Sequence, residues 1–99
     1  MERQYMYVWV REDLSAPQQI VQSSHASARI GELYHSDTNI VLIGVDNENS
    51  LKQISCLLED HEINSHMFFE PDIDQFTAIA SEPLTGDRRK PLRKFKLLK

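Results

Sequence analysis

The sequence is poor in cysteine and glycine, and both shortages exclude particular kinds of site. Its 99 residues include one cysteine, Cys56, and three glycines that stand far apart. A single cysteine cannot form an internal disulfide, and isolated glycines do not make the glycine-rich loop that cradles phosphates. We expect Cys56 to be a small buried residue of a helix rather than a reactive thiol.

Long apolar runs and clustered metal ligands are also missing. No segment approaches the roughly 20 apolar residues that cross a bilayer, and the first residues lack the basic-then-apolar layout of a signal peptide. The four histidines include no pair at the i, i+4 spacing of a helical metal site. We therefore predict a cytoplasmic protein with no membrane partner, no metal and no other cofactor.

Charge is divided unevenly along the chain. Residues 1–87 hold all 15 acidic residues and four basic ones, a net charge of −11, whereas residues 88–99 hold seven basic residues and no acidic one. Such a basic segment can bind nucleic-acid phosphates, pair with carboxylates of its own chain or simply face solvent. Its first three cations, Arg88, Arg89 and Lys90, are candidate phosphate contacts.

Apolar, β-branched runs alternate with helical patterns over most of the chain. Strands are predicted at about 5–10, 39–45, 66–69 and 76–80, and helices at about 16–34 and from 46 or 47 onward. Ser15 is a suitable N-cap for the first helix. This order predicts one α/β domain, residues 1–99, in which a four-stranded mixed sheet is flanked by helices in the order β-α-β-α-β-β, with a basic C-terminal segment at 88–99.

The first helix is expected to carry its polar residues in one stripe. At about 100° per residue, Gln18, Gln22, His25 and Arg29 fall on one face, which we expect to border a cleft. A neighbouring face is made of small and apolar residues and is expected to pack on the sheet: Ile20, Val21, Ser24, Ala28 and Gly31.

Charged residues gather where strands end, which is where ligands bind in α/β folds. Arg11 and Asp13 follow the first predicted strand, and Glu70, Asp72 and Asp74 occupy the turn between the third and the fourth. Turns favour Asp and Pro for backbone reasons alone; alternatively, at least one of these carboxylates lines the cleft. A carboxylate that acts as a general base needs its pKa raised toward neutrality by burial or by a neighbouring carboxylate.

Four short motifs follow one another along the chain. They are VREDL at 10–14, QSSHA at 22–26, EPDIDQFTAIA at 70–80 and FKLL at 95–98. In order and spacing they resemble motifs of the type 2 peptidyl-tRNA hydrolases, which have V-R-x-D-L, Q-x-x-H-A, an Asp-led loop before a strand, and a terminal L-K-L-L. The third motif is similar to the E-P-D-x-x-x-x-T-A-I-A of shorter bacterial and bacteriophage members.

The resemblance implies a mixed four-stranded sheet, a homodimer and hydrolysis of the ester that joins a peptide to the 3′ end of tRNA. This reaction needs a water placed on the ester carbonyl, a group that takes its proton and donors for the oxyanion. Catalytic roles are predicted for His25, Glu70, Asp72 and Thr77, with Glu70 or Asp72 holding the water. Substrate contacts are predicted for Arg11, Asp13, Gln18 and Gln22, and on tRNA for Arg88, Arg89 and Lys90. A structural, hydrogen-bonding role is the alternative for His25 and Gln22.

The chain departs from the family at two places that bear on catalysis. Gln18 stands where the family has a lysine, so that an amide replaces a cation. The acidic turn is shorter than the family's loop, whose arginine and threonine have no clear counterpart here. The alternative is therefore a catalytically inactive module of the same fold that binds RNA, a small anionic ligand or a protein partner. A third reading is a host-interaction protein that uses its acidic surface as a decoy.

Overall fold

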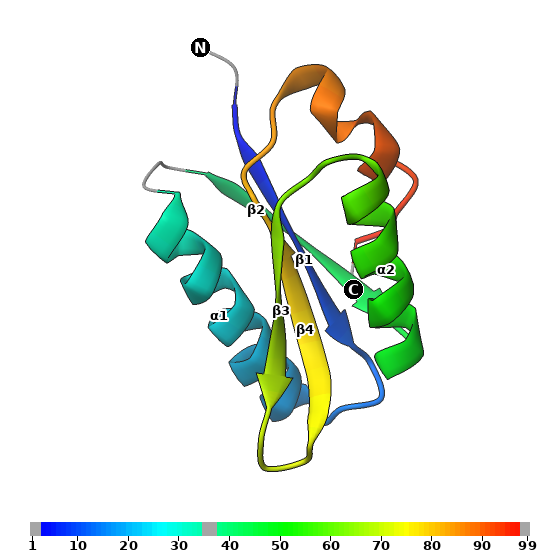
Figure 1. Ribbon diagram of the computed structural model, residues 1–99. Coiled ribbons are helices and arrows are strands. Elements are labelled where there is room, and N and C mark those ends of the chain that lie inside the picture. Colours follow the sequence, from blue (N-terminus) through cyan, green and yellow to red (C-terminus); the bar gives the residue numbers. More distant parts are fainter. Residues whose placement is uncertain (1–2, 35–37, 98–99) are drawn as a thin grey trace.

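Strands and helices alternate along the chain in the order that the sequence predicted (Figure 1). The structure, a computed structural model, describes residues 3–34 and 38–97. The elements are β1 (Tyr5–Arg11), α1 (Ala16–Leu33), β2 (Asn39–Val45), α2 (Glu48–Asp60), β3 (Ser65–Glu70), β4 (Gln75–Ser81) and a short 3-10 helix, η1 (Gly86–Leu92). The predicted fold class, α/β with β-α-β-α-β-β order, is confirmed.

The strands form one mixed sheet in the order β2-β1-β4-β3. β1 runs parallel to β2, from the Tyr5–Asn39 pair to the Arg11–Val45 pair, and antiparallel to β4. β4 also pairs with β3 in antiparallel register. Because β1 is a central strand covered on both faces, its continuous apolar run is buried from residue 6 to residue 10.

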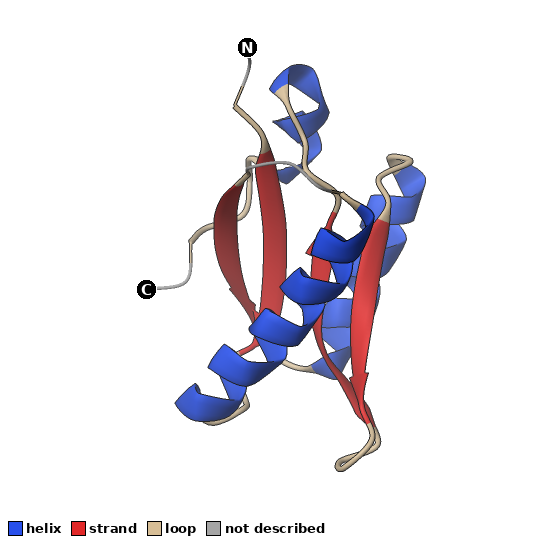
Figure 2. Ribbon diagram, turned by 90° about the vertical axis from the view of Figure 1, so that its left-hand side faces the viewer, coloured by secondary structure: helices blue, strands red, loops and turns tan. Residues whose placement is uncertain are grey.

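Helices cover both faces of the sheet, α1 on one and α2 with η1 on the other (Figures 1 and 2). The side chains under α1 form one apolar cluster with it: Met6, Val8, Val10, Ala26, Ile30, Ala78 and Ala80. The cluster under α2 and η1 is larger and centres on Trp9, which is fully buried. Within the described residues no helix combines the length and the apolar character needed to pass through a bilayer.

The face of α1 that meets the sheet is not the one predicted. Gln22, Ala26 and Ile30 are buried, whereas Ile20 is 67% exposed and Val21 is 49% exposed. The three buried residues are spaced four apart and lie over the alanines of β4. The polar Gln22 can be buried because its side chain makes hydrogen bonds to Glu70 and Thr77. The prediction that the small and apolar face would pack on the sheet was therefore wrong.

The prediction of a buried Cys56 was also wrong. The buried residues of α2 are Leu51, Ile54 and Leu58, and Cys56 is exposed. On a helix of 3.6 residues per turn, position 56 falls well away from the row at 51, 54 and 58. Its thiol therefore faces solvent.

The chain after β4 returns to the sheet on the side of α2. Leu92 of η1 is buried, and the Phe95 ring meets the Trp9 ring edge-on at 5.7 Å between centroids. Leu97 then forms an isolated antiparallel bridge with Ile43 of β2. Residue 98, the last of the terminal motif, and residue 99 lie outside the described part of the chain.

Candidate functional site

A small pocket lies between the first half of α1 and the turn that joins β3 to β4. Its volume is about 110 Å³, and it is lined by Leu14, Gln18, Gln22, Glu70, Asp72, Ile73 and Thr77. Five of these residues were singled out in the sequence as candidate site residues: Gln18, Gln22, Glu70, Asp72 and Thr77. Sequence reasoning missed Leu14 and Ile73, for which the only signal was an apolar residue inside an otherwise polar connection.

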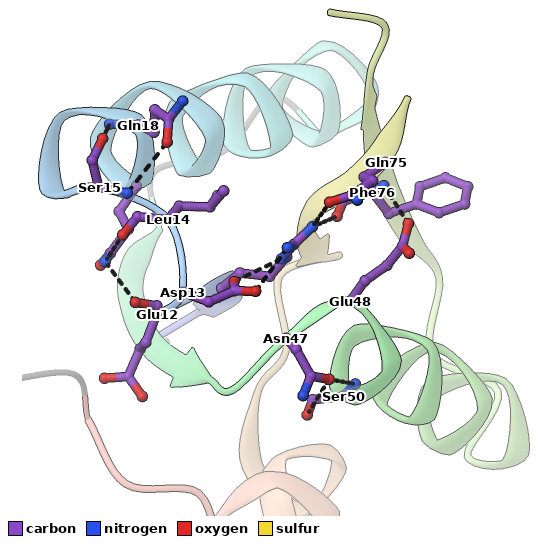
Figure 3. Close-up of polar contacts among 12 residues, drawn as sticks. Glu12, Asp13, Leu14, Ser15, Gln18, Asn47, Glu48, Ser50, Gln75 and Phe76 are labelled. Carbon is purple, nitrogen blue, oxygen red and sulfur yellow. Dashed lines mark hydrogen bonds and ion pairs between the residues drawn. The ribbon is translucent and has the colours of Figure 1, made fainter. Parts of the chain in front are cut away.

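The start of α1 is held by a reciprocal pair of hydrogen bonds between Ser15 and Gln18 (Figure 3). The backbone N–H of Gln18 donates to Ser15 Oγ at 3.3 Å, and the backbone N–H of Ser15 donates to Gln18 Oε1 at 3.2 Å. The Gln18 amide therefore caps the helix and also forms part of the pocket wall. The lysine of the resembled family could not accept the second of these bonds.

A chain of hydrogen bonds connects the buried side of the pocket to its acidic rim. Thr77 Oγ1 donates to Gln22 Oε1 at 2.9 Å, and Gln22 Nε2 donates to Glu70 Oε2 at 3.1 Å. The backbone N–H of Asp72 donates to Glu70 Oε1 at 3.3 Å. Because a carboxylate only accepts, Gln22 must turn its nitrogen toward Glu70 and its oxygen toward Thr77. The Glu70 carboxylate is thereby held on both oxygens.

An irregularity in β4 explains why Thr77 reaches this pocket. Phe68 of β3 pairs with Ala78 and the next residue, Phe69, pairs with Phe76, so Thr77 has no partner on β3. In a regular strand Thr77 would point to the opposite face from Ala78, which packs under α1. A bulge redirects one side chain in this way, and bulges are frequent beside functional sites. The sequence singled out Thr77 through the motif resemblance, but no signal in it marks the bulge.

The pocket has an acidic character. Glu70 is half-buried and Asp72 exposed, and no Lys or Arg is among the residues that line it. Asp74 does not line the pocket. It has the positive φ of 55° that the turn requires, which Asp adopts more readily than most residues. Over residues 3–34 and 38–97, no three His, Cys, Asp or Glu side chains gather closely enough to hold a metal ion.

Arg11 and Asp13 lie next to the pocket without lining it. The buried Arg11 guanidinium donates to both Asp13 oxygens at 2.8 Å, to Gln75 Oε1 at 2.7 Å and to the carbonyl of Phe76 at 3.1 Å. The hydrogen bond from Arg11 is the main reason why the pKa of Asp13 is lowered. These contacts join the end of β1 to the start of β4, where Glu48 of α2 accepts from the backbone of Phe76 (Figure 3).

His25 lies outside the pocket, in a neighbouring groove between α1 and β3. Its ring stacks on Phe68, with centroids 4.6 Å apart and planes 7° from parallel. The groove has a volume of about 440 Å³ and is lined by His25, Ala28, Arg29, Glu32, His66, Met67, Phe68 and Phe69. The polar stripe of α1 is therefore divided, because Gln18 and Gln22 line the pocket and His25 and Arg29 line the groove.

His66, which lines the groove, is expected to make the stability of the protein depend on pH. Burial, and next the charge of Arg29, lower the pKa of His66, while Glu32 opposes them. The folded state thus favours neutral His66, and its contribution is complete above about pH 6.5 and is lost as the pH falls through the lowered pKa. We expect His66→Gln to reduce the loss of stability in urea unfolding between pH 7 and pH 5. The exposed His61→Gln is the control, and an unchanged pH dependence in His66→Gln would contradict the prediction.

The first three cations of the basic segment form ion pairs or hydrogen bonds with other residues of the protein. Arg88 pairs with Glu82 at 3.3 Å, Lys90 pairs with Asp87 at 3.3 Å, and Arg89 donates to the Tyr7 hydroxyl at 2.8 Å. The Arg89 guanidinium also lies 3.5 Å from the centroid of the Tyr5 ring. η1, which carries these residues, lies at the end of the molecule opposite the β3–β4 turn (Figure 1). The structure does not bring them to the pocket.

Comparison with known proteins supports the fold. No family model and no curated protein matches the sequence significantly. The structure is similar to that of Atu0240, a protein of unknown function from Agrobacterium tumefaciens strain C58, with a TM-score of 0.76, 15% sequence identity and 100% of both chains covered. At this identity the likeness shows that the chain folds as a single α/β domain with a four-stranded mixed sheet, and it carries no activity with it.

Proposed function

We propose that this protein is a peptidyl-tRNA hydrolase-like esterase, and that the pocket between α1 and the β3–β4 turn is its active site. The observation that carries the proposal is the hydrogen-bonded chain from Thr77 through Gln22 to Glu70, which holds one carboxylate in a set orientation at the pocket. The motif resemblance to the type 2 peptidyl-tRNA hydrolases supplies the reaction.

Glu70 is the residue best placed to take a proton from water. Each of its oxygens accepts one hydrogen bond from the chain, so each has a lone pair left for a water in the pocket. The water oxygen attacks the ester carbonyl as Glu70 removes one of its protons, the bond to the ribose 3′-oxygen then breaks, and that oxygen takes the proton from Glu70 and leaves as the tRNA hydroxyl. Gln18 Nε2 is the side-chain amide available to steady the oxyanion.

Thr77 acts as a positioning residue in this scheme. Its only hydroxyl proton goes to Gln22, so it sets the direction of the amide rather than attacking the ester. The His25 ring stacks on Phe68 and does not line the pocket, so we assign His25 to the groove.

The basic segment, residues 88–99, supplies a second contact in this proposal. Arg88, Arg89 and Lys90 already have partners within the protein, whereas Arg93 and Lys96 are exposed and form no ion pair among the described residues. A cation that neutralises a phosphate releases the counterion held by that phosphate, and an exposed cation can do so without giving up a partner within the protein. Arg93 and Lys96 are therefore better tRNA contacts than the residues first singled out. The homodimer that the resemblance implies stays a prediction.

A second candidate is the catalytically inactive module. It is favoured by the pocket's lack of a lining cation and by the use of Gln18 Oε1 in the helix cap. The two carboxylates at the rim repel a small anion and an RNA phosphate alike, so a protein partner is the better ligand for the pocket in that case.

The decisive experiment is a cleavage assay with N-acetylaminoacyl-tRNA. We expect release of free tRNA above the spontaneous rate, with a salt dependence that weakens in Arg93→Gln/Lys96→Gln. These substitutions are preferable to truncation at Asp87, which would remove the buried Leu92. Folded protein that leaves the substrate intact at high concentration would refute the esterase, and turnover gained only in Gln18→Lys would favour the inactive module.

A further inference from the structure

The two outer edges of the sheet differ in how they are protected. The outer edge of β2 is bridged by Leu97, whereas no described residue pairs with the outer edge of β3. Exposed edges are usually blunted by lysine, proline or a covering segment, because their free N–H and C=O groups would pair with another chain. β3 reads SHMFFE, with neither lysine nor proline, and Phe69 is 41% exposed. This edge is open to an additional strand.

The groove of about 440 Å³ follows this open edge. Its lining includes four consecutive residues of β3, from His66 to Phe69. Side chains alternate between the two faces of a strand, so a hollow that touches all four must run along the strand's edge. The opposite wall is α1, which lies beside β3 (Figure 2).

The groove leads directly to the proposed active site. Phe69 of the groove precedes Glu70 of the pocket, and His25 of the groove lies about one helical turn after Gln22 of the pocket. Within the groove Arg29 is already paired with Glu32 at 3.4 Å, and the other walls are aromatic, apolar or imidazole. This balance of charge suits an uncharged peptide main chain better than a phosphate.

We propose that the peptide part of the substrate binds in this groove as a strand added to the edge of β3. The inference rests on the proposed function. The esterified residue is the C-terminal one, and it must reach Glu70 at the end of β3, so the peptide runs parallel to β3 with its N-terminus toward Ser65. Main-chain hydrogen bonds then recognise a peptide of any sequence. A groove bordered by residues 66–69 has room for about four residues of extended chain.

The first test measures kcat/KM for tRNA esters of N-acetylated peptides of one to six residues. We expect a rise of roughly tenfold or more up to about four residues and then a plateau, since remote binding energy is used in the transition state. Changes of side chain should matter little, and N-methylation of the peptide backbone should remove the gain. Equal kcat/KM at every length would overturn the inference while leaving the esterase intact.

Blocking the groove gives a matched comparison. Ala28 lines the groove, and Ser24 is exposed on the same helix outside it. Ala28→Trp is expected to abolish the gain with peptide length, and Ser24→Trp is expected to keep it. The same response in both variants would contradict a role for the groove.

A second measurement does not depend on turnover. The full chain is titrated with acetyl-Val-Thr-Val-Ala amide, and backbone amide shifts are followed by NMR. Shifts concentrated at residues 65–69, and absent with the N-methylated peptide, are expected. Such shifts in a protein that hydrolyses nothing would keep the inference and refute the proposed function, whereas no shift in these residues would refute the inference.

Discussion

Replacing Glu70 with glutamine is expected to lower peptidyl-tRNA hydrolysis by at least about 100-fold. The substitution keeps the size and shape of the side chain but removes the group that takes the proton from water. Gln22 can still donate to the new side-chain oxygen, so the hydrogen bonds from Thr77 through Gln22 should stay in place, and only the exposed hydrogen bond from the Asp72 backbone is lost. The loss should therefore appear in kcat, with the thermal unfolding midpoint close to that of the unchanged protein.

Asp74→Asn is the matched control for this experiment. Asp74 belongs to the same turn, is exposed and does not line the pocket. Its φ of 55° suits Asn as well as Asp, so the turn should be preserved. Activity is expected to be retained. Equal activity of Glu70→Gln and Asp74→Asn would remove Glu70 from the proposed mechanism.

Arg11→Met is expected to lower the free energy of unfolding by about 2–3 kcal/mol. The Arg11 side chain is 9% exposed, and its four hydrogen bonds would be lost together. The carbonyl of Phe76 and the Gln75 side chain would lose their donor, and Asp13 would recover only part of its hydration. For a domain of this size the melting temperature should fall by roughly 10–20 °C.

Arg29→Met tests whether burial rather than charge produces this effect. Arg29 is paired with Glu32 at 3.4 Å, but both side chains are at least 60% exposed. Exposed pairs of this kind contribute at most about 0.5 kcal/mol. Similar losses from Arg11→Met and Arg29→Met would show that the buried network carries no special stability.

The Arg11 network also predicts the direction of a pH effect. The folded-state pKa of Asp13 is lowered, chiefly by the hydrogen bond from Arg11. Its contribution to stability is therefore present above the ordinary aspartate pKa of about 3.9 and is lost as the pH falls through the lowered value. The difference in stability between the unchanged protein and Arg11→Met should shrink in acid.

α1 shows which features of the site could be predicted from neighbouring residues in the sequence and which could not. Ser15 and Gln18 predict the start of the helix, because an N-cap side chain needs only neighbours in the chain. The spacing of Gln18, Gln22 and His25 places them on one side of the helix. It does not say where along that side the pocket ends, because the position of β3 decides which residue meets the turn and which meets Phe68.

The sequence by itself determined the order of the elements, the apolar centre of β1 and the presence of carboxylates in the turn after β3. These depend on periodicity, capping and turn preferences, which act over a few residues. Only the tertiary structure decided that Gln22 is buried, that Thr77 bulges toward it and that Arg88 and Arg89 are paired within the chain. Each of these outcomes depends on the register and packing of segments far apart in the chain; a slip of one residue between β3 and β4, for example, would turn Thr77 away from Gln22.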